Sequence, residues 1–274
     1  MIVSELKAAV TEPEAAVAIV HARGERESIL LIRRSERKDD PWSGHWSFPG
    51  GRRDADDPDL LHTALRELEE ECGITLGRGE MSAALRPALA RRAAGPFVLV
   101  APFVLDVGGE LPAVVDGEEA VEAVWIPLSV WRDPGKHRLR AVPGLPGNML
   151  FPAVDLNGVP VWGFTYRLTM EWLGLPAGAG SLEEAGFQVA SRVLDFLVSH
   201  GVRVKQDWQD SHMQDPVGGQ KARLARVEGM IPVKQLVAHF SKPGELFPNL
   251  NIIEIRPDGV RVVGMGFEEY LILN

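Results

Sequence analysis

Three glutamates in the segment Arg66-Glu67-Leu68-Glu69-Glu70-Glu71 have a spacing that could gather carboxylates around a cation. Glu67, Glu70 and Glu71 stand at positions i, i+3 and i+4, which share one side of an α-helix. Like charges at this spacing repel, and a bound cation would relieve the repulsion. Carboxylate oxygens suit Mg²⁺ or Mn²⁺, which complete their coordination with phosphate oxygens. The alternative is an ordinary solvated helix face, because short acidic runs are common on exposed helices.

Two features near the glutamates favour the metal interpretation. A Pro49-Gly50-Gly51 turn lies one loop upstream, and glycine lets the backbone come close to a ligand. Arg66 could pair with a neighbouring carboxylate and fix its rotamer. The surroundings of the acidic segment are therefore those of a site rather than of a plain surface.

The acidic segment belongs to a helix with clear end signals. Asp57 is expected as the N-cap, Pro58 as the first helical residue, and Gly73 as the left-handed residue just past the end. Apolar residues recur between them at spacings of three and four, which predicts one buried face. These residues are Leu60, Leu61, Ala64, Leu65 and Leu68.

Strands and helices alternate in the first part of the chain, and a second unit follows a small, flexible linker at 175–181. We expect a domain at 1–176 and a C-terminal α+β unit at 177–274. Strands are predicted at 15–20, 28–33, 97–107 and 120–128, a loop at 143–160 and a helix at 162–175. In the second unit, helices are predicted at 183–200 and 232–240 and a hairpin at 251–264.

The composition is that of an ordinary soluble globular protein, with 45% hydrophobic and 24% charged residues. The formal charge of −9 disfavours broad attraction to nucleic acid or to an anionic membrane. No segment has the length of apolar sequence that a spanning helix needs, and Cys72 is the single cysteine, so no intramolecular disulfide can form. A cytoplasmic location is the simplest expectation.

The acidic helix resembles the Nudix hydrolases, whose motif is GX5EX7REUXEEXGU, with U a bulky aliphatic residue. The residues Arg66 to Ile74 match REUXEEXGU throughout. The stretch from Gly51 to Arg66 is one residue longer than the pattern, and Asp57 stands near the place of the first Glu. The resemblance implies a Nudix fold of the α/β (α+β sandwich) class, with a mixed sheet between helices. It also implies hydrolysis of a nucleoside diphosphate linked to another group.

Further segments resemble the branch that includes coenzyme A diphosphatases, namely 30–35, 44–57, 118–128 and 161–168. The upstream pattern of that branch is LLTXRSX3RX3GX3FPGG. In this chain Ile32 replaces Thr, the stretch from Ser35 to Gly44 is one residue longer, and Asp39 stands at the second Arg position, which Arg37 or Lys38 could replace. The implied substrate is coenzyme A or an acyl-CoA; another substrate, such as a nucleotide sugar or a dinucleoside polyphosphate, is the alternative.

By resemblance, Glu70 and Glu71 are primary ligands of Mg²⁺ or Mn²⁺, and Glu67 is a ligand or the base that takes a proton from water. The backbone at Gly50 or Gly51 could add a metal bond through its carbonyl, and Gly50 could also contact substrate.

Other candidate residues lie outside the acidic helix, and each has a structural alternative. Glu119 could be an extra ligand or base from across the cleft, or only a solvated loop residue. Arg33 and Arg34 could bind substrate phosphates, or form surface salt bridges. Trp42 and His45, with Trp46, could stack on the substrate, or pack on the core. These alternatives stay open in the sequence.

The second unit carries no motif to which chemistry can be attached. A short helix followed by a hairpin at 232–264 could describe a winged-helix DNA reader, which would make the protein a ligand-sensing regulator. However, residues 177–274 hold 10 Lys and Arg against 12 Asp and Glu, so a basic face is missing. Dimerisation, or a lid over the cleft, is the simpler expectation for this unit.

Overall fold

The structure is a computed structural model of the 274-residue chain. It describes residues 12–37, 43–90, 98–115, 117–143, 145–175, 182–211, 221–244, 250–257, 259–264 and 267–273. Two compact units divide these residues. One contains the described residues of 6–133 together with 156–172, and the other contains those of 134–155 and 173–274. Residues 134–155 therefore group with the C-terminal part, whereas the sequence places the boundary at 176; that boundary stays a prediction.

The first unit is built on a mixed sheet. Its strands follow the spatial order β3-β2-β1-β7-β5, while β4 pairs with β1, β6 with β7 and β8 with β2. β1 runs parallel to β7 and antiparallel to β2, which confirms the predicted mixed sheet. The strands of this sheet are β1 (Ala15–Ala22), β2 (Ser28–Arg34), β3 (Trp46–Ser47), β4 (Gly50–Arg52), β5 (Met81–Ala84), β6 (Ala88–Ala90), β7 (Val98–Val107) and β8 (Ala120–Pro127). A further strand, β11 (Val159–Trp162), pairs with β10 and not with this sheet.

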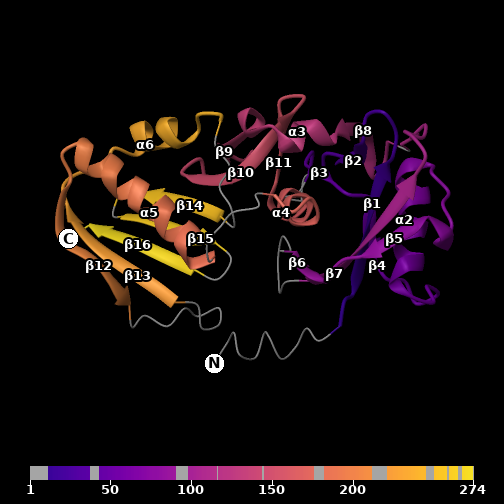
Figure 1. Cartoon of the computed structure of the whole chain (residues 1–274), viewed down its shortest axis with the longest axis horizontal. Helices are drawn as coiled ribbons and strands as arrows, with labels where there is room; N and C mark the ends of the chain where they lie inside the picture. Colours follow the sequence, from indigo (N-terminus) through magenta and orange to yellow (C-terminus); the bar gives the residue numbers. More distant parts are fainter. Residues whose placement is uncertain are drawn as a thin grey trace. The chain divides into compact units, whose positions relative to one another are not determined.

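Helices lie on both faces of this sheet. α2 (Leu60–Cys72) packs Leu61, Ala64 and Leu68 against Ala16 and Leu30 of the strands, and Figure 1 shows α2 beside β1 and β4. Side chains alternate along a strand, so His21 points to the other face, where its ring meets that of Trp172 in α4 (Gly163–Trp172). The unit also contains α3 (Leu128–Arg132) and the 3-10 turn η1 (Arg78–Glu80).

The second unit is a separate sheet with helices over its core. Its strands follow the order β10-β14-β15-β16-β13-β12, and β9 pairs with β10. β13 and β16 are parallel, and the hairpin predicted at 251–264 is present as β14 and β15. The elements are β9 (His137–Ala141), β10 (Met149–Leu156), α5 (Leu182–Ser199), β12 (Arg203–Ser211), β13 (Lys221–Glu228), α6 (Val233–Phe240), β14 (Leu250–Arg256), β15 (Gly259–Gly264) and β16 (Phe267–Leu273), with the 3-10 turn η2 (Pro134–Lys136).

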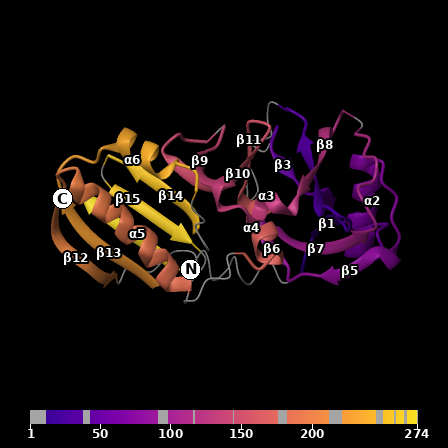
Figure 2. The ribbon, with the colours of Figure 1, turned by 45° about the horizontal axis from the view of Figure 1, so that its top comes forward.

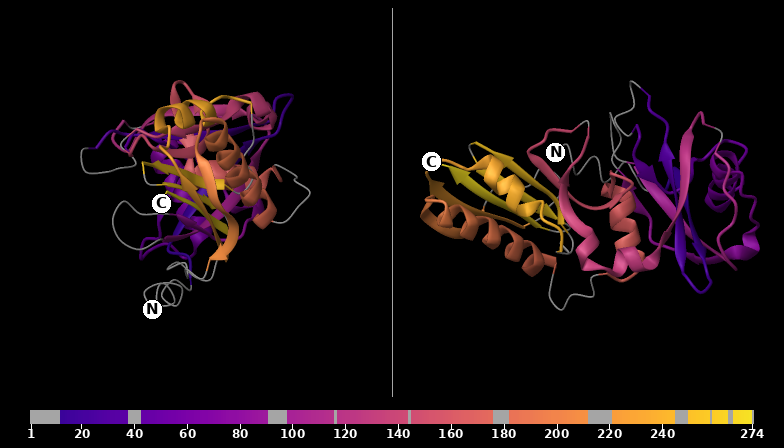
Figure 3. Two further views of the ribbon diagram at one scale, coloured as in Figure 1. Left: turned by 90° about the vertical axis from the view of Figure 1, so that its left-hand side faces the viewer. Right: turned by 90° about the horizontal axis from the view of Figure 1, so that it is seen from above.

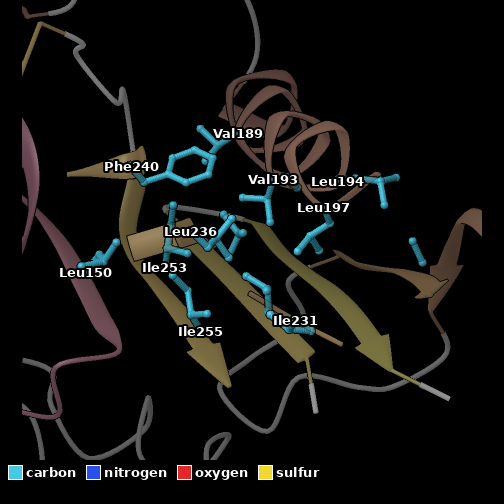
Figure 4. Packing of buried hydrophobic residues seen from close by; sticks show 14 of the residues in the cluster. Leu150, Val189, Val193, Leu194, Leu197, Ile231, Leu236, Phe240, Ile253 and Ile255 are labelled. Carbon is cyan, nitrogen blue, oxygen red and sulfur yellow. The ribbon is translucent and has the colours of Figure 1, made fainter. Parts of the chain in front are cut away.

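The core of the second unit fixes the place of both helices. Val193 and Leu197 of α5 point toward the strands that carry Ile253 and Ile255, as Figure 4 shows. Leu236 of α6 belongs to the same core. Figure 2 shows α5 lying across the strands, and the right-hand view of Figure 3 shows it, in brown-orange, alongside the yellow strands. α6 therefore packs one face on the core of this unit.

Two local predictions are wrong. The helix cap is Asp59, whose side chain accepts from the His62 N–H, and not Asp57, because other groups occupy the carboxylate of Asp57. Pro58 therefore precedes the cap and is not the first helical residue, which is Leu60. The predicted loop at 143–160 instead contains β10 and the start of β11. β10 gains regular pairing from β9 and β14, which local Pro, Gly and Asn content does not reveal. None of the described helices has the combination of length and apolarity needed to cross a membrane.

Candidate active site

Helix α2 presents its three glutamates in two directions. Glu71 is buried with 3% of its surface exposed, and the Glu67 side chain is 13% exposed. The Glu70 side chain is 57% exposed and lies 2.8 Å from Nη1 of Arg66. The common side expected from the spacing thus divides into an inner pair, the buried Glu71 and the partly buried Glu67, and an outer carboxylate held by an arginine.

Strand β4 brings backbone to the buried pair. The Gly50 N–H donates to Oε2 of Glu71 at 2.8 Å. Gly50 has φ 154°, and a Cβ there would collide with the Ala16 carbonyl and with Val17 on the neighbouring strand. Only glycine fits this close approach. The predicted glycine turn therefore fixes one oxygen of Glu71.

Gly51 is required for a different reason. A Cβ at Gly51 would overlap the carboxylate of Glu67, so the missing side chain leaves room for that carboxylate. The structure thus places the glycine pair against both buried glutamates. Its role in binding a metal through a carbonyl stays a prediction.

Burial makes the two inner carboxylates reluctant to ionise. Desolvation raises the pKa of Glu71 to about 8, against a contribution from the Gly50 N–H that lowers it. The charges of Glu67 and Glu119 raise the pKa of Glu71 further, and that of Arg34 lowers it. Desolvation also raises the pKa of Glu67, while Arg66 acts in the opposite direction. Burial therefore favours the protonated form of these carboxyls in the metal-free protein.

Arg66 connects the helix to the loop that precedes it. Its guanidinium donates to both oxygens of Asp57, at 3.2 and 3.1 Å, and lies 3.0 Å from Oε1 of Glu67. Asp57 also accepts from the Asp54 N–H and the Thr63 hydroxyl. The hydrogen bond from Arg66 holds the pKa of the buried Asp57 carboxyl well below its usual range. Asp57 thus anchors Arg66, and Arg66 in turn contacts Glu67 and Glu70, in line with its expected pairing.

The first residues of β8 bring Glu119 toward the glutamates. The Ser35 N–H donates to the Glu119 carbonyl at 2.9 Å, and Arg34 pairs with Ala120 across the sheet. Ala120 is in the core that α2 covers, so Arg34 lies on the α2 side of the sheet. Glu119 is close enough that its charge affects the pKa of both inner glutamates. Arg34 and Glu119 therefore join the predicted site.

Arg33 and His45 are placed away from α2. Side chains alternate along β2, so Arg33 points to the opposite face, where its Nε donates to the Gly44 carbonyl at 3.2 Å. His45 is buried and meets the Trp162 ring edge-on at 5.3 Å. Trp46 is also buried. Trp42 lies outside the described residues. The structure thus supports the core alternative for His45 and Trp46.

The inner carboxylates fit a hard cation by their chemistry. Two buried, mutually repelling carboxylates would be neutralised by a divalent ion, and binding would displace the proton that burial favours. Within the described ranges, no group of three or more His, Cys, Asp or Glu side chains is already arranged to hold a metal. Glu70 would have to leave Arg66, or Glu119 would have to turn inward, to complete such a set.

Sequence reasoning missed one contact at this site. Nη2 of Arg37 lies 3.7 Å from Oε1 of Glu119 and donates to the Glu118 carbonyl at 3.1 Å. The two residues are far apart in sequence, so spacing alone could not pair them. The sequence offered one sign, because Arg37 can replace the second Arg of the coenzyme A pattern.

Comparison with known proteins finds similarity in the part of the chain that holds this site. Residues 12–143 match the family model of the NUDIX domain. The mitochondrial coenzyme A diphosphatase NUDT8 of Mus musculus is 37% identical over 81 residues, which cover 30% of this chain and 37% of that protein. The peroxisomal coenzyme A diphosphatase NUDT7 of Mus musculus is 33% identical over 114 residues, covering 41% and 46%.

A bacterial relative shows similar likeness. The uncharacterized Nudix hydrolase NudL of Yersinia pestis (strain Pestoides F) is 35% identical over 120 residues, covering 43% of this chain and 57% of that protein. The matched part thus spans about a third to somewhat over half of the length of these relatives.

Proposed function

Starting from the NUDIX domain that the chain contains at residues 12–143, we propose that the protein is a metal-dependent diphosphatase. Water would add across the diphosphate bond of a nucleoside diphosphate derivative. The first candidate substrate is coenzyme A or an acyl-CoA, with coenzyme A giving 3',5'-ADP and phosphopantetheine. Two relatives named as coenzyme A diphosphatases support this choice.

One observation carries the proposal. The buried carboxylate of Glu71 is bound by the Gly50 N–H, and the carboxylate of Glu67 occupies the space that the missing Gly51 side chain leaves. Such a buried negative pair is costly unless something compensates it. A metal-binding role explains why the chain would keep it, whereas a solvated helix face would not need buried glutamates.

The residues divide the work as follows in the proposed reaction. Glu67 and Glu71 would hold a Mg²⁺ or Mn²⁺ ion, with Glu70 and Glu119 as further ligands. The ion would neutralise diphosphate oxygens and make a water more acidic. Glu67 or Glu119 would accept the proton from that water. Arg34, on the same side of the sheet, would bind a substrate phosphate.

One departure from the coenzyme A pattern has a structural reason. Ile32 stands in place of Thr, and it is fully buried in the core between the sheet and α2. A side chain in that core cannot touch a substrate, so this difference concerns packing. Asp39 and Lys38 lie outside the described residues. Because the chain matches the coenzyme A pattern only in part, other nucleoside diphosphate derivatives belong in the same test.

The test is hydrolysis of a panel containing coenzyme A, an acyl-CoA, a nucleotide sugar and a dinucleoside polyphosphate, with Mg²⁺ or Mn²⁺. The variants Glu70→Gln and Glu71→Gln should lose most activity. Glu69→Gln is the matched control, because Glu69 is exposed on the same helix and lies between the others in sequence. The proposal fails if no compound turns over, or if Glu71→Gln matches the control.

A DNA-binding regulator is a weaker candidate. α6 contributes Leu236 and Phe240 to the core of the second unit. We propose that this unit, expected at 177–274, serves dimerisation or covers the substrate instead. We also propose a cytoplasmic location, since the single Cys72 is free and buried.

A further inference from the structure

Arg37 occupies a fixed place at the end of β2. The Ser43 hydroxyl accepts from the Arg37 N–H at 2.6 Å and donates to the Arg37 carbonyl at 2.6 Å. The backbone three residues before it is also paired, because the Arg34 N–H donates to the His45 carbonyl and the Gly44 N–H donates to the Arg34 carbonyl. The base of the Arg37 side chain is therefore well anchored.

The guanidinium of Arg37 reaches the loop that carries Glu119. Nη2 donates to the Glu118 carbonyl at 3.1 Å and lies 3.7 Å from Oε1 of Glu119. The Glu119 backbone is held independently by the Ser35 N–H. Both side chains of the ion pair are more than half exposed, at 54% and 56%. Exposed pairs of this kind are weak, so a stronger cation can take the carboxylate away.

Glu119 also interacts electrostatically with the inner glutamates. Its charge raises the pKa of both Glu67 and Glu71. Glu119 thus interacts with both inner glutamates and forms an exposed ion pair with Arg37. Its carboxylate can exchange Arg37 for a bound cation without a change in the backbone.

We infer that Arg37 is a positioning residue that holds Glu119 in the resting protein and gives it up to a divalent cation bound at Glu67 and Glu71. The released guanidinium then takes an oxygen of a substrate phosphate. Cation binding and phosphate binding become mutually favourable, because each removes the ion pair that opposes the other. The inference rests on the proposed function, since it concerns the same metal site.

The first measurement is Mn²⁺ affinity without substrate, by electron paramagnetic resonance of the free ion. Arg37→Gln should bind Mn²⁺ about two- to fivefold more tightly than the parent, which is the range that loss of an exposed ion pair corresponds to. In a Glu119→Gln background the carboxylate that would bind the metal is absent. Arg37→Gln should then change the Mn²⁺ affinity by less than about 1.5-fold, which is within experimental error. Glu119→Gln alone should weaken binding.

A matched control accounts for the loss of a positive charge. Arg132→Gln removes an equally exposed arginine whose carboxylate partner is Glu27, at 3.5 Å, and should leave Mn²⁺ affinity unchanged.

The second measurement is binding of inorganic phosphate in saturating Mg²⁺. Arg37→Gln should weaken it roughly tenfold, because a charge-assisted hydrogen bond is lost.

The outcomes distinguish the exchange of Glu119 between Arg37 and the cation from the proposed metal site itself. Equal effects of Arg37→Gln in the parent and in the Glu119→Gln background, or an unchanged phosphate affinity, overturn the exchange. If Mn²⁺ binds and Glu71→Gln abolishes binding, the proposed metal site stands even when the exchange fails. If the parent binds no Mn²⁺, the proposed function and the exchange fail together. Circular dichroism of each variant shows that it is folded.

Discussion

Replacing Glu71 with glutamine should stabilise the metal-free protein at high pH while removing its activity. Burial raises the pKa of this carboxyl from 4.5 to about 8. Glutamine has nearly the same shape, cannot ionise, and keeps an oxygen for the Gly50 N–H. Glu71→Gln therefore keeps the packing and removes only the free-energy cost of burying a negative charge.

The sign of the pH dependence follows from where the proton is held. Between pH 4.5 and about 8 the folded protein keeps the Glu71 proton, whereas the unfolded chain has lost it. The free energy of unfolding of the parent must then fall as pH rises through this range, and level off above the folded pKa. A pKa unit corresponds to about 1.4 kcal/mol, so a rise from 4.5 to about 8 corresponds to a full effect on the order of 5 kcal/mol. At pH 4.5 the parent and Glu71→Gln should be nearly equal.

The assay is hydrogen exchange of the α2 amides at pH 5, 7 and 8.5, because these amides report on the unit that contains Glu71. The difference in stability between Glu71→Gln and the parent should grow from near zero to a few kcal/mol. Glu69→Gln should follow the parent, since Glu69 is exposed. At pH 8.5, saturating Mg²⁺ should protect the parent but not Glu71→Gln.

Two results would refute the reasoning about Glu71. A constant difference across the pH range would mean that the carboxyl is solvated in the folded protein. Protection of Glu71→Gln by Mg²⁺ equal to that of the parent would mean that the ion binds elsewhere.

Three further predictions test other parts of the fold. Gly51→Ala should reduce hydrolysis at least about tenfold with a stability loss of roughly 1–2 kcal/mol, because the methyl group would displace the Glu67 carboxylate; a full-rate Gly51→Ala enzyme would contradict this. Asp57→Asn should cost about 3 kcal/mol by denaturant unfolding at pH 7, since Arg66 loses a buried partner. Because the pKa of Asp57 is lowered, this contribution is present above the ordinary pKa of 3.8 and is lost as the pH falls further, so the parent and Asp57→Asn should converge in acid. Leu236→Ala should destabilise the second unit by about 2–4 kcal/mol, seen as faster exchange of its strand amides, and an unchanged rate would place α6 outside the core.

The sequence predicted those parts of the first unit that depend on neighbouring residues. Gly73 ends α2 in the left-handed conformation, with φ 63°, and its N–H donates to the Glu69 carbonyl, as a glycine at that position should. The apolar stripe with Leu61 and Leu68 also faces the core. These features follow from local backbone preferences and helix periodicity, which a single sequence contains.

Features that depend on distant pairing escaped prediction. β10 forms between β9 and β14, although the sequence from 143 to 160 is rich in turn residues. The place of Glu119 depends on the pairing of β8 with β2, where Arg34 lies opposite Ala120. In each case a partner far along the chain outweighs the local preference.

The extra residue in the loop before α2 can be understood from the side chain that it positions. The Nudix pattern has Glu in this loop, whereas this chain has Asp57, which is one methylene shorter. Counted from Gly51, Asp57 stands at the spacing that the pattern gives to that Glu, so the extra residue lies between Asp57 and Arg66. The Asp57 N–H donates to the Asp54 carbonyl at 3.1 Å, which turns the backbone before α2. The shorter carboxylate then still meets Arg66 through both oxygens. The departure from the pattern therefore keeps a carboxylate on Arg66, the arginine that contacts Glu67 and Glu70.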